Sequence, residues 1–253
     1  MRKLFRIAVA TAFWSLLVCV LWVLVLAVVQ PPVTWLMVQQ RFERGAVKRT
    51  TVPLHRISRS MPLAVIASED QKFMEHFGFD MEAIQDAMDR NARRKGKRVR
   101  GASTISQQTA KNVFLWPGRT WLRKGLEVGF TFLVECCWSK QRILAVYLNV
   151  AETGKGVFGV EAAAQRCFGR SAIALSPSQA ALIAVTLPSP RRYDCKRPGS
   201  FISRRQQWTL AQMRNIGDVL DPEVRAAQRE ERERLERARE ERKARRARKR
   251  APQ

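Results

Sequence analysis

Glu69, Asp70 and His76 lie close together in the stretch SEDQKFMEHFGFD, residues 68–80. When this stretch is projected as an α-helix, at about 100° per residue, Asp70 falls within the apolar side. Glu69 and His76 fall at the edge of that side, whereas Glu75 falls on the opposite, polar arc. An ordinary surface helix points its carboxylates toward water. This pattern therefore predicts a helix that points two acids toward the interior, and it marks a candidate site for proton transfer.

A second polar pattern lies in GASTISQQTAKN, residues 101–112. If Ser103 caps a helix, four polar residues recur at i, i+3, i+4 and i+7 on one stripe: Thr104, Gln107, Gln108 and Lys111. Such a row can bind sugar hydroxyls or phosphate oxygens, although an arbitrary polar stripe is more often a solvated face. The preceding basic run RRKGKRVRG, residues 93–101, could attract phosphates and is equally consistent with nucleic-acid binding.

A third candidate is RKGLE, residues 123–127, in which Glu127 lies one turn from Arg123 and three residues from Lys124. A surface ion pair is the simplest interpretation, and such a pair contributes little to stability. However, the same helix continues VGFTFLVECCW and is apolar over most of its circumference. We therefore expect Glu127 to lie in a cleft, held there by its basic neighbours.

The N-terminal segment is long and apolar enough to cross a membrane. No charged residue occurs from Ile7 to Val29, a helix roughly 35 Å long, whereas the hydrocarbon core is about 30 Å thick. Arg2, Lys3 and Arg6 precede this segment and no small-residue cleavage site follows it, which predicts an uncleaved anchor with a cytoplasmic N-terminus. The net charge of +24 requires an anionic partner, which could be nucleic acid, phospholipid or a phosphorylated substrate.

The rest of the chain divides where its composition changes. Residues 31–61 follow Pro31-Pro32 and read as a membrane-proximal linker with one short helix at 33–45. Residues 62–220 show helical patterns without convincing strands, so the predicted fold class is mainly α. Residues 221–253 are almost wholly Glu, Arg, Lys and Ala, and predict a lone charged helix or a disordered tail. The chain has five cysteines and two histidines but no CxxC or HExxH, which argues against a zinc site.

The order of the motifs is more specific than any one of them. EDQKFMEHFGFD, GASTISQQTAKN, RKGLE, KQRILAVYLN (140–149) and GVFGVEAAAQRCFG (156–169) follow one another behind a single membrane span. This series resembles the five motifs of glycosyltransferase family 51, and in particular its monofunctional biosynthetic peptidoglycan transglycosylases, over roughly residues 62–217. Two positions depart from the family pattern: Ala145 stands where Glu is common, and Cys167 stands where an aromatic residue is usual.

The resemblance implies a lysozyme-like glycosyltransferase domain behind one N-terminal transmembrane helix. It places the protein in the bacterial inner membrane, single-pass, with the catalytic domain on the periplasmic side. The implied substrate is lipid II, a disaccharide-pentapeptide on undecaprenyl pyrophosphate. In the implied inverting reaction, a carboxylate deprotonates the 4-hydroxyl of the acceptor sugar. That hydroxyl attacks the anomeric carbon of the donor, forms a β-1,4 bond and expels the lipid pyrophosphate.

Carried over residue by residue, the resemblance assigns Glu69 as the general base and Glu127 as the second catalytic glutamate, near the pyrophosphate. Partial burial beside Val65 and Phe73 would keep the pKa of the base near working pH. The implied substrate-binding residues are Asp70, Thr104, Gln107, Gln108, Lys111, Asn112, Arg123, Lys124 and Lys140. No organic cofactor is expected, whereas a divalent metal, Mg or Mn, could act at Glu127.

Two other classes of function remain open. A lytic transglycosylase shares the fold and one glutamate but cleaves glycan strands; the second glutamate and the cations suited to pyrophosphate argue against it. A membrane-tethered nucleic-acid-binding protein would explain the charge but not the ordered motifs, so we expect no nucleic-acid partner. The expected partners are lipid II, the growing lipid-linked glycan, the membrane, and proteins of cell-wall synthesis or division.

Overall fold

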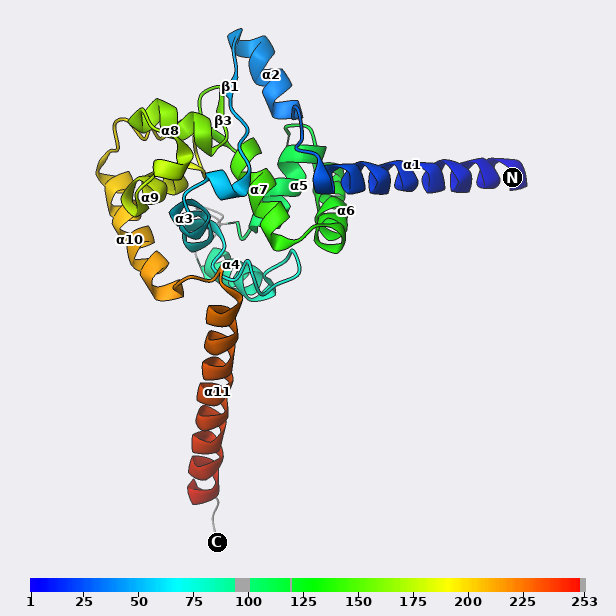
Figure 1. Cartoon of the computed structure of the whole chain (residues 1–253). Coiled ribbons are helices and arrows are strands. Elements are labelled where there is room, and N and C mark those ends of the chain that lie inside the picture. Colours follow the sequence, from blue (N-terminus) through cyan, green and yellow to red (C-terminus); the bar gives the residue numbers. More distant parts are fainter. Residues whose placement is uncertain (94–100, 119, 251–253) are drawn as a thin grey trace.

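The structure, a computed structural model, describes residues 1–93, 101–118 and 120–250, with residues 243–250 described by their backbone alone. The described chain is mainly α-helical, as the sequence predicts, and two long helices project from its body (Figure 1). One is α1 (Arg2–Val28) at the N-terminus, and the other is α11 (Pro222–Arg250) near the C-terminus. Between them the described α-helices are α2 (Trp35–Arg44), α3 (Ser60–Glu69), α4 (Met81–Arg93), α5 (Ile105–Phe114), α6 (Trp121–Cys137), α7 (Lys140–Val150), α8 (Val160–Phe168), α9 (Pro177–Thr186) and α10 (Ser200–Ile216).

Hydroxyl side chains fix where several of these helices begin. In α2, α5, α6, α7 and α9, the side-chain oxygen of the N-cap residue accepts the backbone N–H three residues later. These caps are Thr34, Thr104, Thr120, Ser139 and Ser176. The sequence expectation that Ser103 caps α5 is therefore wrong: the cap is Thr104, and its hydroxyl is already used by the backbone.

Helix α3 forms the centre of the domain, where it packs against α9 and α10, while α5 packs against α6 and α7. Val65 and Ile66 of α3 are fully buried, as are Ile143 and Leu144 of α7. Burial of such side chains stabilises the fold by roughly 1.5–3 kcal/mol each. This packing keeps the C-terminal end of α3 rigid. Glu69, the first candidate carboxylate, lies at that end.

A small sheet joins the segment after α2 to the segment after α7. Its strands lie in the order β1 (Lys48–Arg49), β3 (Val157–Phe158) and β2 (Glu152–Gly154), with β1 parallel and β2 antiparallel to β3. The expectation that strands are absent is therefore wrong. Runs of two or three residues are too short to show an alternating pattern. The buried Asn149 continues the connection, since its side chain bonds both the N–H and the C=O of Val52 at 2.9 Å.

The last turns of α1 belong to the domain rather than standing apart from it. Val23 is fully buried and Leu26 is 6% exposed. Trp138 Nε1 donates to the Val23 carbonyl at 2.8 Å, and Arg142 Nη2 donates to the Leu26 carbonyl at 2.9 Å. Within the part of the chain that the structure describes, α1 is the one helix long and apolar enough to cross a membrane, and it fits a membrane anchor.

A disulfide connects Cys167, at the end of α8, to Cys195, in the segment between α9 and α10, with a Cα–Cα distance of 5.8 Å. Cys195 packs with Leu182, Val185 and Ile202 in a small cluster beside the main core. The sequence gives no indication of this pairing. Cys167, one of the two positions that depart from the family pattern, thus forms half of a disulfide bond.

Helix α11 is attached to the domain at its base and then extends away from it (Figure 1). Arg225 Nη1 donates to the Val219 carbonyl at 2.8 Å, and Gln228 Nε2 donates to the Ile216 carbonyl at 2.8 Å. Arg232 donates to both carboxylate oxygens of Glu75, at 2.6 and 2.9 Å. Of the two alternatives for the tail, the described residues form the charged helix.

Candidate active site

Glu69 is the last residue of α3, and the chain does not continue as a helix beyond it. The helical projection of residues 68–80 is therefore wrong after Glu69. Asp70 adopts φ −162° and ψ 79°, and its buried carboxylate accepts the N–H of Ile105, the first residue of α5, at 2.9 Å. His76 Nε2 lies 2.9 Å from the other oxygen of Asp70. Asp70 thus joins the end of α3, the following turns and the positive end of α5.

Gly78 allows the turns after α3 to pass close to α6. Its φ is +78°, a conformation in which glycine is favoured, and a Cβ there would lie 2.9 Å from Thr131 Cγ2 and 3.1 Å from Glu135 Cγ. The Gly78 carbonyl accepts the Thr104 hydroxyl at 2.6 Å. The glycine of the first motif therefore has a steric reason, and the turn it forms holds the start of α5 in place.

The Glu69 carboxylate is held by one oxygen and leaves the other free of protein partners. Gln108 Nε2 donates to Glu69 Oε2 at 2.9 Å, and the buried Tyr147 hydroxyl lies 3.1 Å from Gln108 Oε1, to which it donates. Glu69 Oε1 is buried and has no hydrogen-bond partner among the described residues. An oriented carboxylate with one uncommitted oxygen is arranged to accept a proton from a substrate hydroxyl.

The electrostatic surroundings of Glu69 push its pKa in both directions. Burial raises the pKa of Glu69 above its ordinary value, and the nearby Asp70 charge adds to this increase. The Gln108 hydrogen bond, Arg205 and Lys111 oppose it. The pKa of Glu69 remains raised on balance, which is the direction that a general base at neutral pH requires.

Glu127 lies in a very different environment, on the inner face of α6. Its side chain is 4% exposed, and each carboxylate oxygen has a cationic partner. Lys124 Nζ lies 2.5 Å from Oε1, and Arg123 Nη1 lies 3.3 Å from Oε2. The prediction that basic neighbours hold a buried Glu127 agrees with this geometry. We call the three cations around Glu127, namely Lys111, Arg123 and Lys124, the cation cluster.

Lys111 connects the two glutamates electrostatically. Burial lowers the pKa of the Lys111 ammonium, and Arg123 and Lys124 lower it further, while Glu127 and Glu69 raise it. Among the described residues the ammonium forms no hydrogen bond or ion pair, so its donors are available to a ligand. A half-buried cation surrounded by other cations is a favourable site for phosphate oxygens.

The remaining predicted binding residues lie outside the cation cluster. Thr104 and Gln107 form the capping box of α5, so their side chains serve that helix start. Lys140 is not gathered with the cation cluster: its Nζ bonds Glu135 Oε1 at 2.7 Å and the His76 carbonyl at 2.6 Å. Asn112 is half-buried on α5, one residue beyond Lys111. The direct substrate roles assigned to these four residues stay predictions.

Several residues of the site carry no signal in the sequence. Nothing in the sequence distinguishes Tyr147 from the apolar residues around it, yet its hydroxyl positions Gln108. Glu135 is buried and accepts hydrogen bonds from both Ser106 and Lys140. Arg205 approaches Glu69 from α10, outside all five motifs. The one sequence signal that could have identified Glu135 is a charged residue within an otherwise apolar stretch of helix.

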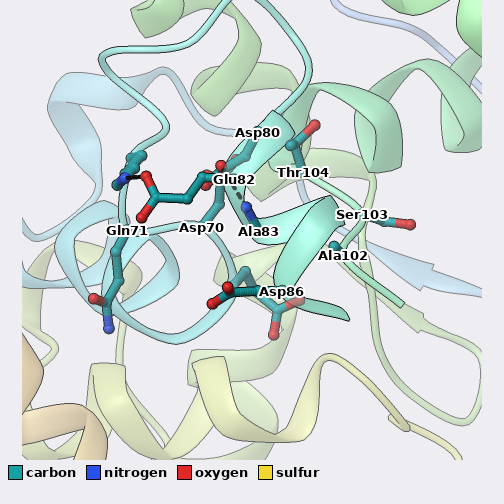
Figure 2. Close-up of a pocket in the computed structure, with 11 residues that line it drawn as sticks. Asp70, Gln71, Asp80, Glu82, Ala83, Asp86, Ala102, Ser103 and Thr104 are labelled. Atoms are coloured by element: carbon teal, nitrogen blue, oxygen red, sulfur yellow. Dashed lines mark hydrogen bonds and ion pairs between the residues drawn. The ribbon is translucent and has the colours of Figure 1, made fainter. Parts of the chain in front are cut away.

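Beside Glu69 opens a pocket of about 280 Å³ whose lining is mainly acidic (Figure 2). Figure 2 shows Asp70, Asp80, Glu82 and Asp86 around it, with Ser103 and Thr104 from the segment that leads into α5. Lys72 also lines the pocket and pairs with Glu82. Acids thus line this pocket, whereas Lys111 and Arg205, the cations that act on Glu69, do not. The basic run at 93–101 lies outside the described residues except for its two ends.

The surroundings of Glu127 give little support for a protein-held metal. Within the described chain no group of three or more His, Cys, Asp or Glu residues could hold a metal ion. Glu127 is a single carboxylate, and both of its oxygens already pair with cations. A Mg or Mn ion remains a prediction, and it would have to take most of its ligands from substrate phosphates and water.

Together, the fold and the site define a class: a helical domain whose N-terminal helix fits a membrane anchor, with a buried carboxylate of raised pKa near a cluster of cations. The particular family follows from comparison. The family model described as Transglycosylase matches residues 37–214. The biosynthetic peptidoglycan transglycosylase of Xanthomonas axonopodis pv. citri (strain 306) is 53% identical over 205 residues, which cover 78% of this chain and 82% of that relative. The chain therefore belongs to the transglycosylase family.

Relatives of similar identity occur in other bacteria. The biosynthetic peptidoglycan transglycosylase of Yersinia pseudotuberculosis serotype O:3 (strain YPIII) is 57% identical over 166 residues, which cover 66% of this chain and 68% of that relative. That of Xanthomonas oryzae pv. oryzae (strain KACC10331 / KXO85) is 49% identical over 223 residues, covering 85% and 90%. The family predicted from the five motifs is confirmed.

Proposed function

We propose that this protein is a peptidoglycan glycosyltransferase that polymerises lipid II into β-1,4 glycan strands. The observation that carries the proposal is the pair of unlike carboxylates on either side of Lys111. Glu69 has a raised pKa and an uncommitted oxygen, whereas Glu127 lies within the cation cluster. A polymerase of this kind needs a base for the acceptor hydroxyl and cations for the pyrophosphate that leaves.

In the proposed mechanism, Glu69 Oε1 takes the proton of the acceptor 4-hydroxyl while the oxygen attacks the anomeric carbon of the donor. Gln108 holds the other Glu69 oxygen and thus fixes the direction of the free one. The anomeric C–O bond breaks as the new C–O bond forms, and the electron pair leaves with the pyrophosphate. Lys111, Arg123 and Lys124 stabilise the charge that develops there, in a partly buried place where such stabilisation is effective.

The cation cluster distinguishes this proposal from glycan cleavage. A lytic transglycosylase expels a sugar hydroxyl, so it needs no group to neutralise a departing pyrophosphate. The family and the names of the relatives also favour biosynthesis over cleavage.

We further propose that the catalytic domain lies outside the cytoplasm, on the periplasmic side. The Cys167–Cys195 disulfide supports this orientation, because disulfides persist in oxidising compartments. The outer face of α6 adds support for contact with lipid: Trp121 is 92% exposed and Leu122 70% exposed, and Phe132 lies on the same helix. Proteins of cell-wall synthesis or division are the expected further partners.

The membrane contact of α6 can be tested apart from the anchor. Since Val23 and Leu26 are part of the core, the cut should remove residues 1–20 and leave these side chains in place. We expect the shortened protein to remain bound to vesicles or detergent. Replacing Trp121 and Leu122 by Ser in the shortened protein should weaken its binding to the vesicles or detergent. A shortened protein that does not bind lipid at all would contradict the proposed surface.

The direct test of function is purified protein with lipid II, scored for polymer and for released undecaprenyl pyrophosphate. We expect one undecaprenyl pyrophosphate to be released for each glycosidic bond in the polymer. A matched reaction with isolated glycan strands should give no cleavage. Cleavage of strands without consumption of lipid II would support the lytic alternative instead.

A further inference from the structure

Helix α10 presents one polar face to the end of α3. Ile202, Arg205, Thr209 and Gln212 recur at helical spacing, so they share a side of the helix. Ile202 is 2% exposed and Thr209 is fully buried, which identifies this side as the one that packs against the domain. Gln71, two residues after Glu69, donates its side-chain N–H to Gln212 Oε1 at 3.4 Å. Arg205 therefore lies half-buried on the face of α10 that packs toward α3, the helix that ends at Glu69.

The guanidinium of Arg205 is supported but not neutralised. Its Cζ lies 4.7 Å from the centre of the Trp208 ring, a geometry typical of a cation–π contact. Among the described residues it forms no hydrogen bond and no ion pair. It nonetheless interacts with the Glu69 carboxylate through space. Its position on α10 puts it across α3 from α5, which carries Lys111 and Gln108 (Figure 1).

We propose that Arg205 is a positioning residue of the active site: resting on Trp208, its charge keeps the Glu69 carboxylate ionised and its free oxygen available. This inference rests on the proposed role of Glu69 as the base. Arg205 would not touch the reacting atoms. It would act through Glu69, and Trp208 would act through Arg205.

The charges around Glu69 explain why one cation is not enough to keep its carboxylate ionised. Asp70 opposes ionisation of Glu69 from the same segment, and Lys111 favours it from α5. The buried Tyr147 of α7 is neutral, since burial raises its pKa well above 10. On the remaining side lie the pocket acids Asp80, Glu82 and Asp86, of which Glu82 pairs with Lys72 and Asp86 pairs with Arg90.

Substrate binding would increase this imbalance. A pyrophosphate bound at the cation cluster brings negative charge toward Glu69 and occupies Lys111. Negative charge nearby raises the pKa of a carboxylate, so Glu69 would tend to take up a proton before the acceptor arrives. Arg205 lies across α3 from that cluster and would remain available to oppose this shift. It would therefore matter most in the complex that is about to react.

The test compares Arg205→Gln with Arg204→Gln, its exposed neighbour on α10, in lipid II polymerisation across pH. Arg205 lowers the pKa of Glu69, so its removal should raise that pKa and move the acidic limb of kcat/KM to higher pH. If the acidic limb moves by one pH unit, kcat/KM at a pH below the limb falls about tenfold. Activity should recover as pH rises. Arg205→Lys should keep most of the original profile, and Arg204→Gln should leave it unchanged.

Loss of activity by the same factor at every pH would mean a structural role and would overturn the proposal, as would an unchanged profile. If Arg205→Gln does not fold, as judged by circular dichroism, Trp208→Leu replaces it. This variant removes the support of Arg205 and should shift the limb in the same direction by less; an unshifted limb overturns the proposal. Glu69→Gln separates the two claims: full activity there rejects the base itself, whereas an inactive Glu69→Gln with an unshifted Arg205→Gln rejects only Arg205.

Discussion

Glu69 and Glu127 are the same residue type in one cleft, yet their surroundings give them opposite characters. Glu69 shares one oxygen with an uncharged amide and keeps the other free, while burial raises its pKa. Glu127 is more deeply buried, and both of its oxygens are paired with cations. Because both Glu127 oxygens already contact cations, neither is left uncommitted to receive a proton from a substrate hydroxyl. The partners, rather than the residue type, decide which glutamate is the base.

The largest expected effect comes from Glu69→Gln, which keeps the size of the side chain but cannot accept a proton. We expect turnover of lipid II to fall by about 10²- to 10⁴-fold, the usual contribution of general-base catalysis, while lipid II binding is retained. Polymerisation assays and binding to lipid II in micelles measure the two effects. Glu43→Gln, an exposed carboxylate on α2, is the matched control and should be unaffected. Substantial activity of Glu69→Gln would reverse the roles of the two glutamates.

Glu127→Gln should have the next largest effect. It leaves Arg123 and Lys124 without their carboxylate partner, so the cations lose the group that orients them. Charge-assisted hydrogen bonds contribute about 1.5–3 kcal/mol, so we expect roughly a ten- to hundredfold loss of turnover. Weaker binding of the donor should account for much of it, which a rise in KM would reveal. If KM stays constant and kcat falls as far as in Glu69→Gln, the distinction between the two glutamates fails.

The pH profile of kcat/KM should sharpen the comparison, since it reports groups of the free enzyme. The acidic limb should lie above the ordinary carboxylate range, because the pKa of Glu69 is raised. The alkaline limb should lie below the ordinary lysine range, because burial lowers the pKa of Lys111. Glu127 raises that pKa, so Glu127→Gln should move the alkaline limb to lower pH and leave the acidic limb in place. Movement of the acidic limb instead would contradict this assignment.

The smallest effect should come from the tail, which lies outside both carboxylate environments. Truncation after Asp221 removes the Arg232–Glu75 pair, and an exposed pair contributes at most about 1 kcal/mol. We expect turnover in detergent to stay within about twofold, and Glu75→Gln to be equally mild. Binding to anionic liposomes should weaken, with a difference that disappears at high salt. Loss of turnover in detergent would mean that the tail supports the segment after Glu69.

The sequence could predict the chemistry better than the geometry. The motifs identified Glu69, Glu127 and three residues of the cation cluster, because these lie in short stretches of fixed spacing. The helical projection failed after Glu69, because Asp70 bonds the start of α5, a contact between residues far apart in the chain. Arg205 and the Cys167–Cys195 pair were missed for the same reason. Local periodicity cannot report contacts that only the folded chain creates.

The union of α1 with the domain core has a consequence for the direction of synthesis. A flexible linker would let the cleft rotate freely above the bilayer, and each substrate would then meet it in a random orientation. With Val23 and Leu26 packed inside the domain and Trp138 bonded to the backbone of α1, the anchor and the cleft turn as one body. Rotation about the membrane normal is then the main freedom left. If α1 spans the membrane, the angle between the span and the cleft is fixed, so successive sugars would leave at a constant angle to the axis of α1.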